Sequence, residues 1–315
     1  MTFNSQLDKQ QVQQIFVAYD ASPVAAFKLL SGGSENTNFW VKTGSAEYVL
    51  TICEQKSIDE CIQLANLLDY LQAQHFVTSG AVKTLDGRKT SLWCDKPVIV
   101  KTFIKGVILQ DISTSLLFGL GNSLGNLHAI KAPNYLPNVV SFGKQNFDLV
   151  NQYAADSVFN HWLQACTAYI DDFVSDYLPK TLIHSDIFAD NIIIDAASQQ
   201  ATIMDFEEAS YYYRIFDIGM MLVGCCCHDQ QLSLTKAASL LQGYQQVIKL
   251  QDNEIAALQA FTVYAAAATA FWRHQNYHYV NPTPDMFEHH LAMTKLADNI
   301  RQISVADFSK ILDLS

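Results

Sequence analysis

One stretch in the second half of the chain constrains the fold more than any other. The run L-I-H-S-D-I-F-A-D-N places His184, Asp186 and Asn191 at the spacing H-x-D-x-x-x-x-N, and the run I-M-D-F-E-E-A follows with Asp205. Enzymes that transfer phosphoryl groups arrange a base and two metal ligands in this order and at this spacing. The pattern therefore predicts a kinase-like fold and a site for phosphoryl transfer.

The residue types fit that chemistry. A hydroxyl group that attacks the γ-phosphate of ATP needs a carboxylate to orient it and to accept its proton, and we assign this role to Asp186. Mg²⁺ ions that bridge phosphates prefer hard oxygen ligands. The amide oxygen of Asn191 and the carboxylate of Asp205 supply such oxygens, so ATP and Mg²⁺ are the predicted cofactors.

The residues between the two predicted metal ligands indicate a β-hairpin. Residues 191–194 and 201–204 are short apolar runs rich in β-branched side chains, and the turn 195–200 between them is polar. The start of one strand and the end of the next lie side by side in an antiparallel pair. We therefore expect Asn191 and Asp205 to reach the same ion.

Composition and charge limit the class of protein. The chain has 315 residues, of which 50% are hydrophobic and 16% are charged, so we expect a globular protein with a substantial core. Its formal net charge of −11 and the lack of a basic run argue against nucleic-acid binding and against docking on an anionic membrane. The expected partners are a nucleotide and a small-molecule hydroxyl acceptor; the oligomeric state is left open.

Targeting signals and cysteines indicate a cytoplasmic protein. Residues 1–14 are polar and lack the apolar segment of a secretory signal. No uninterrupted apolar run reaches membrane-spanning length, and we expect the longest candidates to be core helices. The seven cysteines, an odd number, are expected to be reduced thiols. Residues 225–227 are three consecutive cysteines without a partner pair at ligand spacing, so we interpret them as buried side chains and not as a zinc site.

The pattern along the chain predicts an α+β protein in two parts. A nucleotide-binding part at residues 1–105 and a catalytic, substrate-binding part at 106–315 are joined by a short hinge at 103–106. The second part is expected to be mainly helical around the catalytic loop. The predicted strands of the first part are 27–30, 37–42, 47–52, 81–84 and 91–102, and its predicted helices are 7–19 and 57–74.

A Gly-rich turn at residues 31–34 separates the first two predicted strands. Glycines allow the backbone to approach phosphates closely and leave N–H groups free to face them. An ordinary β-turn is the alternative interpretation. The residues that we expect to contact the nucleotide phosphates are Ser34, Glu35, Asn36, Thr37 and Asn38.

Several runs together resemble a known family. G-G-S-E-N-T-N-F-W-V, E-Y-V-L-T-I-C-E, L-I-H-S-D-I-F-A-D-N and D-F-E-E-A occur in this order over residues 27–228. They are similar to runs of the bacterial type II homoserine kinases, in the aminoglycoside phosphotransferase and choline kinase superfamily. The resemblance implies a protein-kinase-like fold with two lobes. The small lobe has an antiparallel sheet plus a helix, and the large lobe is mainly helical.

The resemblance also implies an activity and assigns residues to it. The family transfers the γ-phosphate of ATP to the side-chain hydroxyl of L-homoserine, a step toward threonine. By motif, Asp186 corresponds to the base, Asn191 and Asp205 to the Mg²⁺ ligands, and residues 34–38 to part of the phosphate loop. His184 is expected to hydrogen-bond the backbone near Asp186. Asp217, at the start of an apolar helix, is expected to have a structural role in bracing the catalytic loop.

The chain departs from the superfamily at one phosphate-binding position. Thr51 stands where many members have Lys or Arg, so the cation that contacts the phosphates is unassigned. Lys42, Lys56 and Lys101 are candidates, and exposure to solvent is the alternative role for each.

The acceptor pocket is the least determined part of the site. Glu207 and Glu208 are candidates for binding an acceptor's ammonium group, and solvated surface carboxylates are the alternative. Trp272 and Arg273 lie where the family has an aromatic and Arg-rich helix. An arginine there would suit the carboxylate of an amino acid through a bidentate contact.

Two alternatives to homoserine phosphorylation remain. The run D-F-E-E-A followed by three tyrosines at 211–213 is also similar to choline and ethanolamine kinases, so a kinase for an amino alcohol or an aminoglycoside is one alternative. A nucleotide-binding scaffold without catalysis is the other. The presence of Asp186, Asn191 and Asp205 together weakens the scaffold reading.

Overall fold

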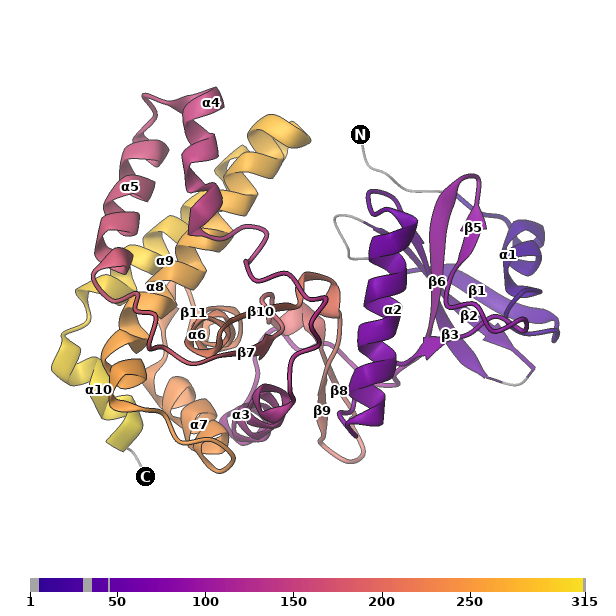
Figure 1. The fold of residues 1–315 in the computed structure, drawn as a ribbon, viewed down its shortest axis with the longest axis horizontal. Coiled ribbons are helices and arrows are strands. Elements are labelled where there is room, and N and C mark those ends of the chain that lie inside the picture. Colours follow the sequence, from indigo (N-terminus) through magenta and orange to yellow (C-terminus); the bar gives the residue numbers. More distant parts are fainter. Residues whose placement is uncertain (1–5, 31–35, 45, 314–315) are drawn as a thin grey trace. The chain divides into compact units, whose positions relative to one another are not determined.

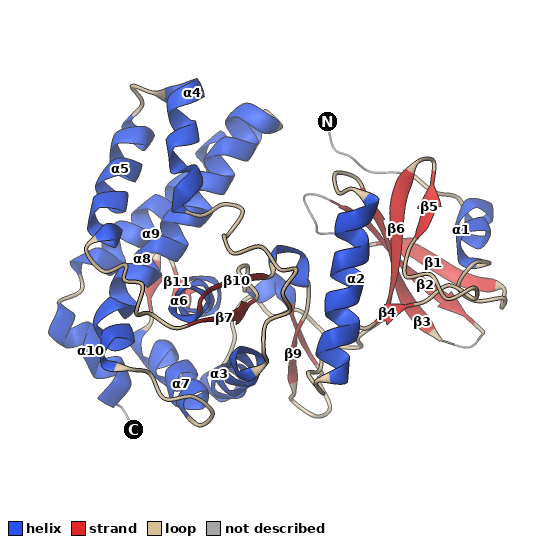
Figure 2. Ribbon diagram, in the orientation of Figure 1, coloured by secondary structure: helices blue, strands red, loops and turns tan. Residues whose placement is uncertain are grey.

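The structure is a computed structural model that describes residues 6–30, 36–44 and 46–313. The predicted phosphate-loop residues Ser34 and Glu35 lie outside this part of the chain. The chain forms two compact units, the first consisting of Met1–Lys105 with Met204–Phe206 and the second of Gly106–Ile203 with Glu207–Ser315. Strands make up much of the first unit, and helices dominate the second (Figure 2).

The first unit is built on an antiparallel sheet. The strand order is β1-β2-β3-β6-β4, and β5 also pairs with β6. Figure 1 shows the helices α1 (Lys9–Phe16) and α2 (Ile58–Ala73) on opposite sides of this sheet. The strands are β1 (Val24–Leu29), β2 (Asn36–Thr43), β3 (Glu47–Cys53), β4 (Ala81–Val82), β5 (Ser91–Trp93) and β6 (Lys96–Thr102).

One face of the sheet packs against α1. Along β2 the side chains alternate, so that Phe39 and Val41 are buried while Trp40 between them is partly exposed. Phe39 and Val41 join Phe16 of α1 in one hydrophobic cluster. Asp8 begins α1, because its carboxylate accepts a hydrogen bond from the backbone N–H of Gln11 at 2.8 Å.

The prediction of a single strand at 91–102 is wrong, because the chain reverses there. Cys94 and Asp95 have φ angles of 49° and 63°, and β5 and β6 pair with each other on either side of them. Two consecutive residues with positive φ are typical of a tight hairpin turn. The sequence did not indicate this turn, because neither residue is a glycine, which is common in such turns. The predicted strand 81–84 is also shorter in the structure, where β4 ends at Val82.

The second unit consists mainly of packed helices. Among its elements, α8 contacts α5, α6 and α9, and α3 contacts α7 (Figure 1). The α-helices are α3 (Thr114–Ala129), α4 (Asn151–Ala154), α5 (Val158–Asp171), α6 (Arg214–Cys225), α7 (Leu234–Gln245), α8 (Asp252–Gln275), α9 (Leu291–Gln302) and α10 (Val305–Asp313). The shorter helical segments are η1 (Lys144–Val150), η2 (Ala189–Asn191), η3 (Phe206–Glu208, which starts in the first unit), η4 (Asn276–Val280) and η5 (Pro284–His290).

Two glycines explain how closely α3 and α7 approach. A Cβ atom added at Gly121 would lie 1.9 Å from the backbone oxygen of Leu240, and one at Gly243 would lie 1.9 Å from that of Phe118. Each helix thus uses a glycine where the backbone of the other helix lies against it. Any larger side chain at either position would force the two helices apart.

Helix α8 is the central helix of the second unit. By length and composition alone the segment Asp252–Val280 is long and apolar enough to cross a membrane, which corrects the expectation that no apolar run has that length. However, 83% of its most apolar window is buried inside the protein. Such burial is typical of a core helix.

Short strands in the second unit flank the predicted catalytic loop, residues 184–191. Strand β7 (Lys180–Ile183) leads into the loop and pairs with β10 (Ser210–Tyr213), which leads into α6. Between them lies the hairpin of β8 (Ile192–Ile194) and β9 (Ala201–Ile203). This is the hairpin predicted from the sequence, with each strand one residue shorter.

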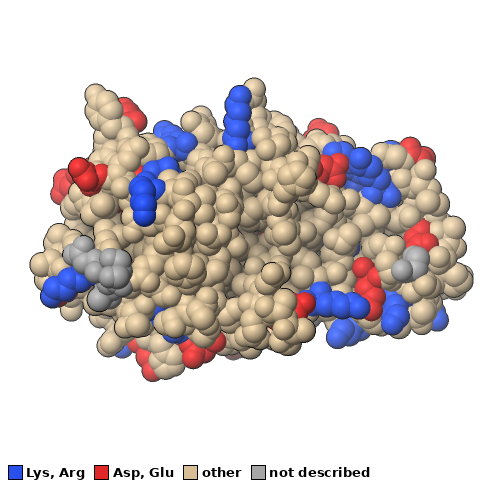
Figure 3. Space-filling view, turned by 90° about the horizontal axis from the view of Figure 1, so that it is seen from below, with Lys and Arg blue, Asp and Glu red and all other residues tan. Residues whose placement is uncertain are grey.

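Charged side chains of both signs are interspersed on the face shown in Figure 3. Among the described residues on that face, Lys and Arg do not gather into one continuous field. A surface that binds nucleic acid usually carries a continuous patch of positive charge.

Candidate active site

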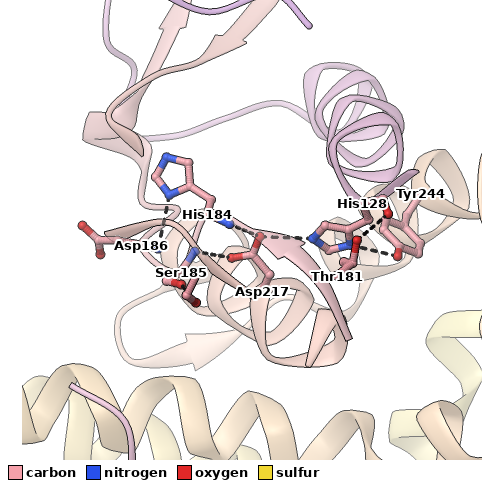
Figure 4. A network of polar contacts seen from close by, with 8 residues as sticks. His128, Thr181, His184, Ser185, Asp186, Asp217 and Tyr244 are labelled. Atoms are coloured by element: carbon pink, nitrogen blue, oxygen red, sulfur yellow. Dashed lines mark hydrogen bonds and ion pairs between the residues drawn. The ribbon is translucent and has the colours of Figure 1, made fainter. Parts of the chain in front are cut away.

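The loop 184–191 is fixed by a buried carboxylate from α6. Asp217 is fully buried, and its two oxygens accept hydrogen bonds from the backbone N–H groups of His184 and Ser185, each at 2.8 Å (Figure 4). Asp217 lies in the first turn of α6, yet the N–H groups that it accepts belong to the loop after β7. The structure therefore places this side chain as a brace between α6 and the catalytic loop.

Ser185 has a backbone conformation that needs such a brace. Its φ angle is 76°, in the left-handed region that costs a non-glycine residue about 1–3 kcal/mol. Its N–H is held by Asp217, and its hydroxyl lies 3.0 Å from that of Ser210 on β10. These contacts hold the sharp turn that directs the next residue, Asp186, out of the strand.

A histidine supports the brace from a third element. His128 of α3 is buried, and its Nε2 lies 3.1 Å from Oδ2 of Asp217 while its Nδ1 lies 3.0 Å from the hydroxyl of Tyr244 on α7. Burial raises the pKa of Tyr244, so its hydroxyl stays protonated and can donate a hydrogen bond to Nδ1. In the tautomer that accepts this bond, the N–H at Nε2 donates to the carboxylate of Asp217.

His184 contacts the backbone of the predicted base. It is fully buried, and its Nδ1 accepts a hydrogen bond from the backbone N–H of Asp186 at 3.2 Å. This is the kind of contact expected of a structural residue in the loop. Figure 4 shows the carboxylate of Asp186 turned away from Asp217 and His128. The buried network thus holds the backbone of Asp186 and leaves its carboxylate outside the network.

Asn191 contacts Asp186 through its amide nitrogen. Its Nδ2 donates to the backbone oxygen of Asp186 at 2.8 Å and lies 3.4 Å from the carboxylate oxygen Oδ2. Because Nδ2 of Asn191 donates to Asp186, the amide oxygen of Asn191 lies on the side of the amide group away from that contact. That orientation suits a ligand to a cation and fixes the distance between the two side chains.

Asp205, which follows the β8–β9 hairpin, has a carboxylate oxygen that could act as a hard ligand. Ile192 pairs with Ile203, so Asn191 and Met204 flank the end of the hairpin, and Asp205 follows with a φ angle of 70°. Its Oδ1 is buried and has no hydrogen-bond partner among the described residues. An orphaned buried carboxylate oxygen is costly unless something else satisfies it. Such an oxygen fits a hard divalent cation such as Mg²⁺.

In the first unit, the described phosphate-loop residues are part of the sheet. The hydroxyl of Thr37 donates to Oε1 of Glu54 at 2.7 Å, and that of Thr51 donates to Oδ1 of Asn38 at 2.7 Å. Asn36 is the first residue of β2 and the first described residue after the Gly-rich segment 31–34 of the sequence. The structure thus gives the side chains of Thr37 and Asn38 a role within the strands, and it explains Thr51 as a cross-strand partner of Asn38.

The structure gives contacts for two of the candidate phosphate-binding lysines. Nζ of Lys42 lies 3.8 Å from Glu47, and the Lys42 side chain is half exposed, as expected for a surface residue. Lys101 lies on β6 opposite Val49. An ion pair that the sequence did not predict links Lys96 to Glu54, whose side chain is fully buried.

Two predicted substrate residues lie in η3. Glu207 and Glu208 are both partly buried, and the carboxylate of Glu208 accepts a hydrogen bond from the hydroxyl of Ser141. This contact ties η3 to the segment that follows α3. The contact restrains the side chain of Glu208. From the sequence we expect either an ammonium-binding residue or a solvated surface carboxylate, and neither expectation includes this contact.

The other two predicted substrate residues lie in the last turn of α8. Arg273 donates from Nη1 to the backbone oxygen of His289 at 3.3 Å, and the ring of Trp272 lies edge-on to that of Tyr277. Burial lowers the pKa of Arg273, while Tyr277 and the negative charges of Asp190 and Asp186 act in the opposite direction. The charges of Asp190 and Asp186 thus act on this guanidinium group, although the sequence places it 87 residues after Asp186.

Comparison with known proteins defines the class. The phosphotransferase enzyme family matches residues 26–259, and the chain belongs to this family. The predicted α+β, protein-kinase-like fold is confirmed, and the protein is a phosphotransferase that acts on a hydroxyl group.

Similar curated proteins are homoserine kinases. That of Gluconobacter oxydans (strain 621H) is 26% identical over 90% of this chain and 92% of its own length. That of Paramagnetospirillum magneticum (strain ATCC 700264 / AMB-1) is 25% identical over 90% of both chains. The predicted resemblance to this group is therefore confirmed.

Similar solved structures include kinases for other acceptors. The microcompartment-associated aminopropanol kinase has a TM-score of 0.74 at 16% identity and covers 96% of this chain and 100% of its own. A spectinomycin phosphotransferase in complex with ADP and spectinomycin has a TM-score of 0.69 at 12% identity and covers 95% of this chain and 100% of its own. At such identities these similarities establish the fold alone.

Proposed function

We propose that this phosphotransferase transfers the γ-phosphate of ATP to the side-chain hydroxyl of L-homoserine, with Mg²⁺ as the metal ion. The products are O-phospho-L-homoserine and ADP. The names of the curated relatives support homoserine as the acceptor, and the ADP held by one structural neighbour supports a nucleotide as the donor. The reaction belongs in the cytoplasm, where the seven free cysteines of the chain remain reduced.

The observation that carries the proposal is the way in which Asp186 is held. Its backbone N–H is bound by His184, its backbone oxygen by Asn191, and the turn before it by Asp217. A carboxylate fixed in this way orients the acceptor hydroxyl before the reaction, which removes much of the entropic cost of reaching the transition state. Asp186 is therefore proposed as the base.

The transfer follows from this arrangement. The hydroxyl oxygen of the acceptor attacks the γ-phosphorus, and the bond between that phosphorus and the β,γ-bridging oxygen breaks to release ADP. Asp186 accepts the hydroxyl proton and passes it to solvent. Asn191 and Asp205 would hold Mg²⁺, which when bound neutralises charge on the phosphates.

Arg273 favours an acceptor with a carboxylate. Its guanidinium group is partly buried, is influenced by the charges of Asp190 and Asp186, and forms no ion pair within the described residues. Choline and ethanolamine lack a carboxylate, whereas homoserine carries one. The two carboxylates of η3 favour the second candidate, a cationic amino alcohol, through Glu207 and Glu208.

The test is the rate of ADP release with MgATP and each of five acceptors: L-homoserine, choline, ethanolamine, 1-amino-2-propanol and spectinomycin. We expect turnover with L-homoserine and at most a small fraction of that rate with the others. Preferential turnover of a cationic amino alcohol would overturn the homoserine assignment and favour the second candidate. ATP binding without turnover of any acceptor would favour the scaffold reading.

A further inference from the structure

Helix α6 begins with an arginine that the proposed reaction does not use. Arg214 is the first residue of the helix, and the helix dipole disfavours a cation at this end. The side chain of Arg214 is only 13% exposed, so water does not solvate most of it. A buried cation in this position needs a partner of opposite charge.

The partner is the carboxylate of Glu254 in the first turn of α8. Arg214 donates to it twice, from Nε to Oε1 at 2.7 Å and from Nη2 to Oε2 at 2.5 Å. The side chain of Glu254 is fully buried, and its Oε2 also accepts the backbone N–H of Gln251 at 2.9 Å. A bidentate contact between a guanidinium group and a carboxylate fixes orientation as well as distance.

Two other contacts hold α6 in the second unit. The backbone N–H of Arg214 donates to the oxygen of Pro179 at 3.1 Å, directly before β7. In the middle of α6, Gly219 lies against α8, because a Cβ atom there would lie 2.6 Å from the backbone oxygen of Phe261. The close packing at Gly219 sets how near the two helices lie. Apolar contacts are not directional, so the ion pair at the start of α6 is the contact that fixes the register of the helices.

The register of α6 determines where Asp217 lies. Asp217 is one turn after Arg214, and its carboxylate accepts the backbone N–H groups of His184 and Ser185, each at 2.8 Å (Figure 4). A small shift of α6 would move both acceptor oxygens relative to the catalytic loop. Misplacement of a catalytic group by about 1 Å can lower the rate of an enzyme by about 100-fold.

We propose that Arg214 and Glu254 are positioning residues for the base, Asp186. The ion pair fixes α6 on α8, α6 places Asp217, and Asp217 holds the turn before Asp186. This inference rests on the proposed function in one respect, the role of Asp186 as the base, and it does not depend on which acceptor is phosphorylated. It gives the buried ion pair a role in the rate of phosphoryl transfer, in addition to any role in stability.

The test removes both charges of the pair at once. A variant that lacks only one partner leaves an unpaired buried charge and can fail to fold, whereas replacing both partners by neutral side chains of similar size often costs little stability. The double variant Arg214→Met/Glu254→Gln should therefore melt near the temperature of the wild type. Its kcat should fall by about 10–100-fold because the base is displaced. The KM values for MgATP and for the acceptor should stay within about twofold of the wild type, because no group that binds them has changed.

Two further variants and a control complete the set. Arg214→Lys keeps the charge but loses the bidentate geometry, so its kcat should lie between those of the wild type and the double variant. Asp217→Asn added to the double variant should lower kcat by less than the product of the separate losses, because both changes act on the same turn. Lys236→Met/Asp111→Asn removes an ion pair between α7 and the segment before α3, and it should change neither kcat nor KM.

The outcomes separate this inference from the proposed function, because all rates are measured with the acceptor that the wild type phosphorylates fastest. A double variant with kcat within about twofold of the wild type would overturn the positioning role and leave the proposed function in place. A similar loss in kcat and in the affinity for both substrates would also overturn it, because that result indicates general damage. Preference of the wild type for an acceptor other than L-homoserine would overturn only the acceptor assignment. Failure of the wild type to phosphorylate any acceptor would overturn both proposals.

Discussion

His128 Nε2 lies 3.1 Å from the carboxylate of Asp217, although 89 residues separate the two in the chain. This contact joins α3 to α6 inside the core of the second unit. Through it, the fold of the second unit is connected directly to the orientation of the predicted base, because Asp217 holds the turn that precedes Asp186.

Replacement of His128 should therefore reduce both stability and activity. His128→Ala leaves the buried carboxylate of Asp217 without one donor and creates a cavity, so we expect the free energy of unfolding to fall by about 2–4 kcal/mol. Urea denaturation measures this change. Tyr244→Phe is the matched control, since it removes only the outer hydrogen bond and should cost about 1 kcal/mol. Equal stability of His128→Ala and wild type would contradict the bracing role.

The close approach of α3 and α7 gives a second prediction. Gly243→Ala would place a Cβ atom 1.9 Å from the backbone oxygen of Phe118, so overpacking should destabilise the protein by about 1–3 kcal/mol. Gly119→Ala on α3 is the control, because its Cβ would meet no atom within 4 Å. It should stabilise the helix by about 0.5–1 kcal/mol. Thermal unfolding of both variants checks the pair, and a stable Gly243→Ala would show that the helices are less tightly packed.

Stability should fall in acid because of a buried histidine. Burial, with smaller effects of His290 and His278, lowers the pKa of His274 from its usual 6.5 to about 3. Between these pH values the unfolded chain binds a proton that the folded protein does not bind, so the free energy of unfolding falls as the pH drops from about 6.5 toward 3. His274→Gln removes this titration. The urea midpoint of the variant should change less between pH 7.5 and pH 5 than that of the wild type.

Asp205 provides the prediction for the metal ion. Asp205→Asn removes a negative charge from the proposed Mg²⁺ site, which should raise the Mg²⁺ concentration needed for half-maximal activity and lower kcat by about a hundredfold or more. Binding of Mn²⁺ in the presence of ATP, followed by electron paramagnetic resonance, gives a readout that does not depend on turnover. Asp195→Asn, in the turn of the same hairpin, is the control and should bind Mn²⁺ normally. Normal Mn²⁺ binding by Asp205→Asn would exclude it as a ligand.

The sequence predicted the β8–β9 hairpin and the fold class, because these depend on local patterns. The motif spacing fixed the order of Asp186, Asn191 and Asp205, and two short β-branched runs around a polar turn identified β8 and β9. The opening helix and the helix after β3 were also predicted, since apolar residues at helical spacing mark them. Their capping residues, Asp8 and Ser57, place the starts of the observed helices.

The remaining features depend on contacts between distant segments. His128 lies in the last turn of an apolar helix, and nothing nearby in the sequence marks its contact with Asp217. The turn at Cys94 and Asp95 was missed because the common signal for such a turn is a glycine.

The most direct test of the account compares the wild type with Asp186→Asn by ³¹P NMR, using MgATP and L-homoserine. The account predicts that the wild type forms ADP and one new phosphomonoester in equal amounts. It predicts that Asp186→Asn still binds MgATP but forms the phosphomonoester about 10²–10⁴-fold more slowly, the contribution of a positioned base. Formation of the phosphomonoester by Asp186→Asn at the wild-type rate would contradict the assignment of Asp186 as the base, and ADP without a phosphomonoester in the wild type would contradict homoserine as the acceptor.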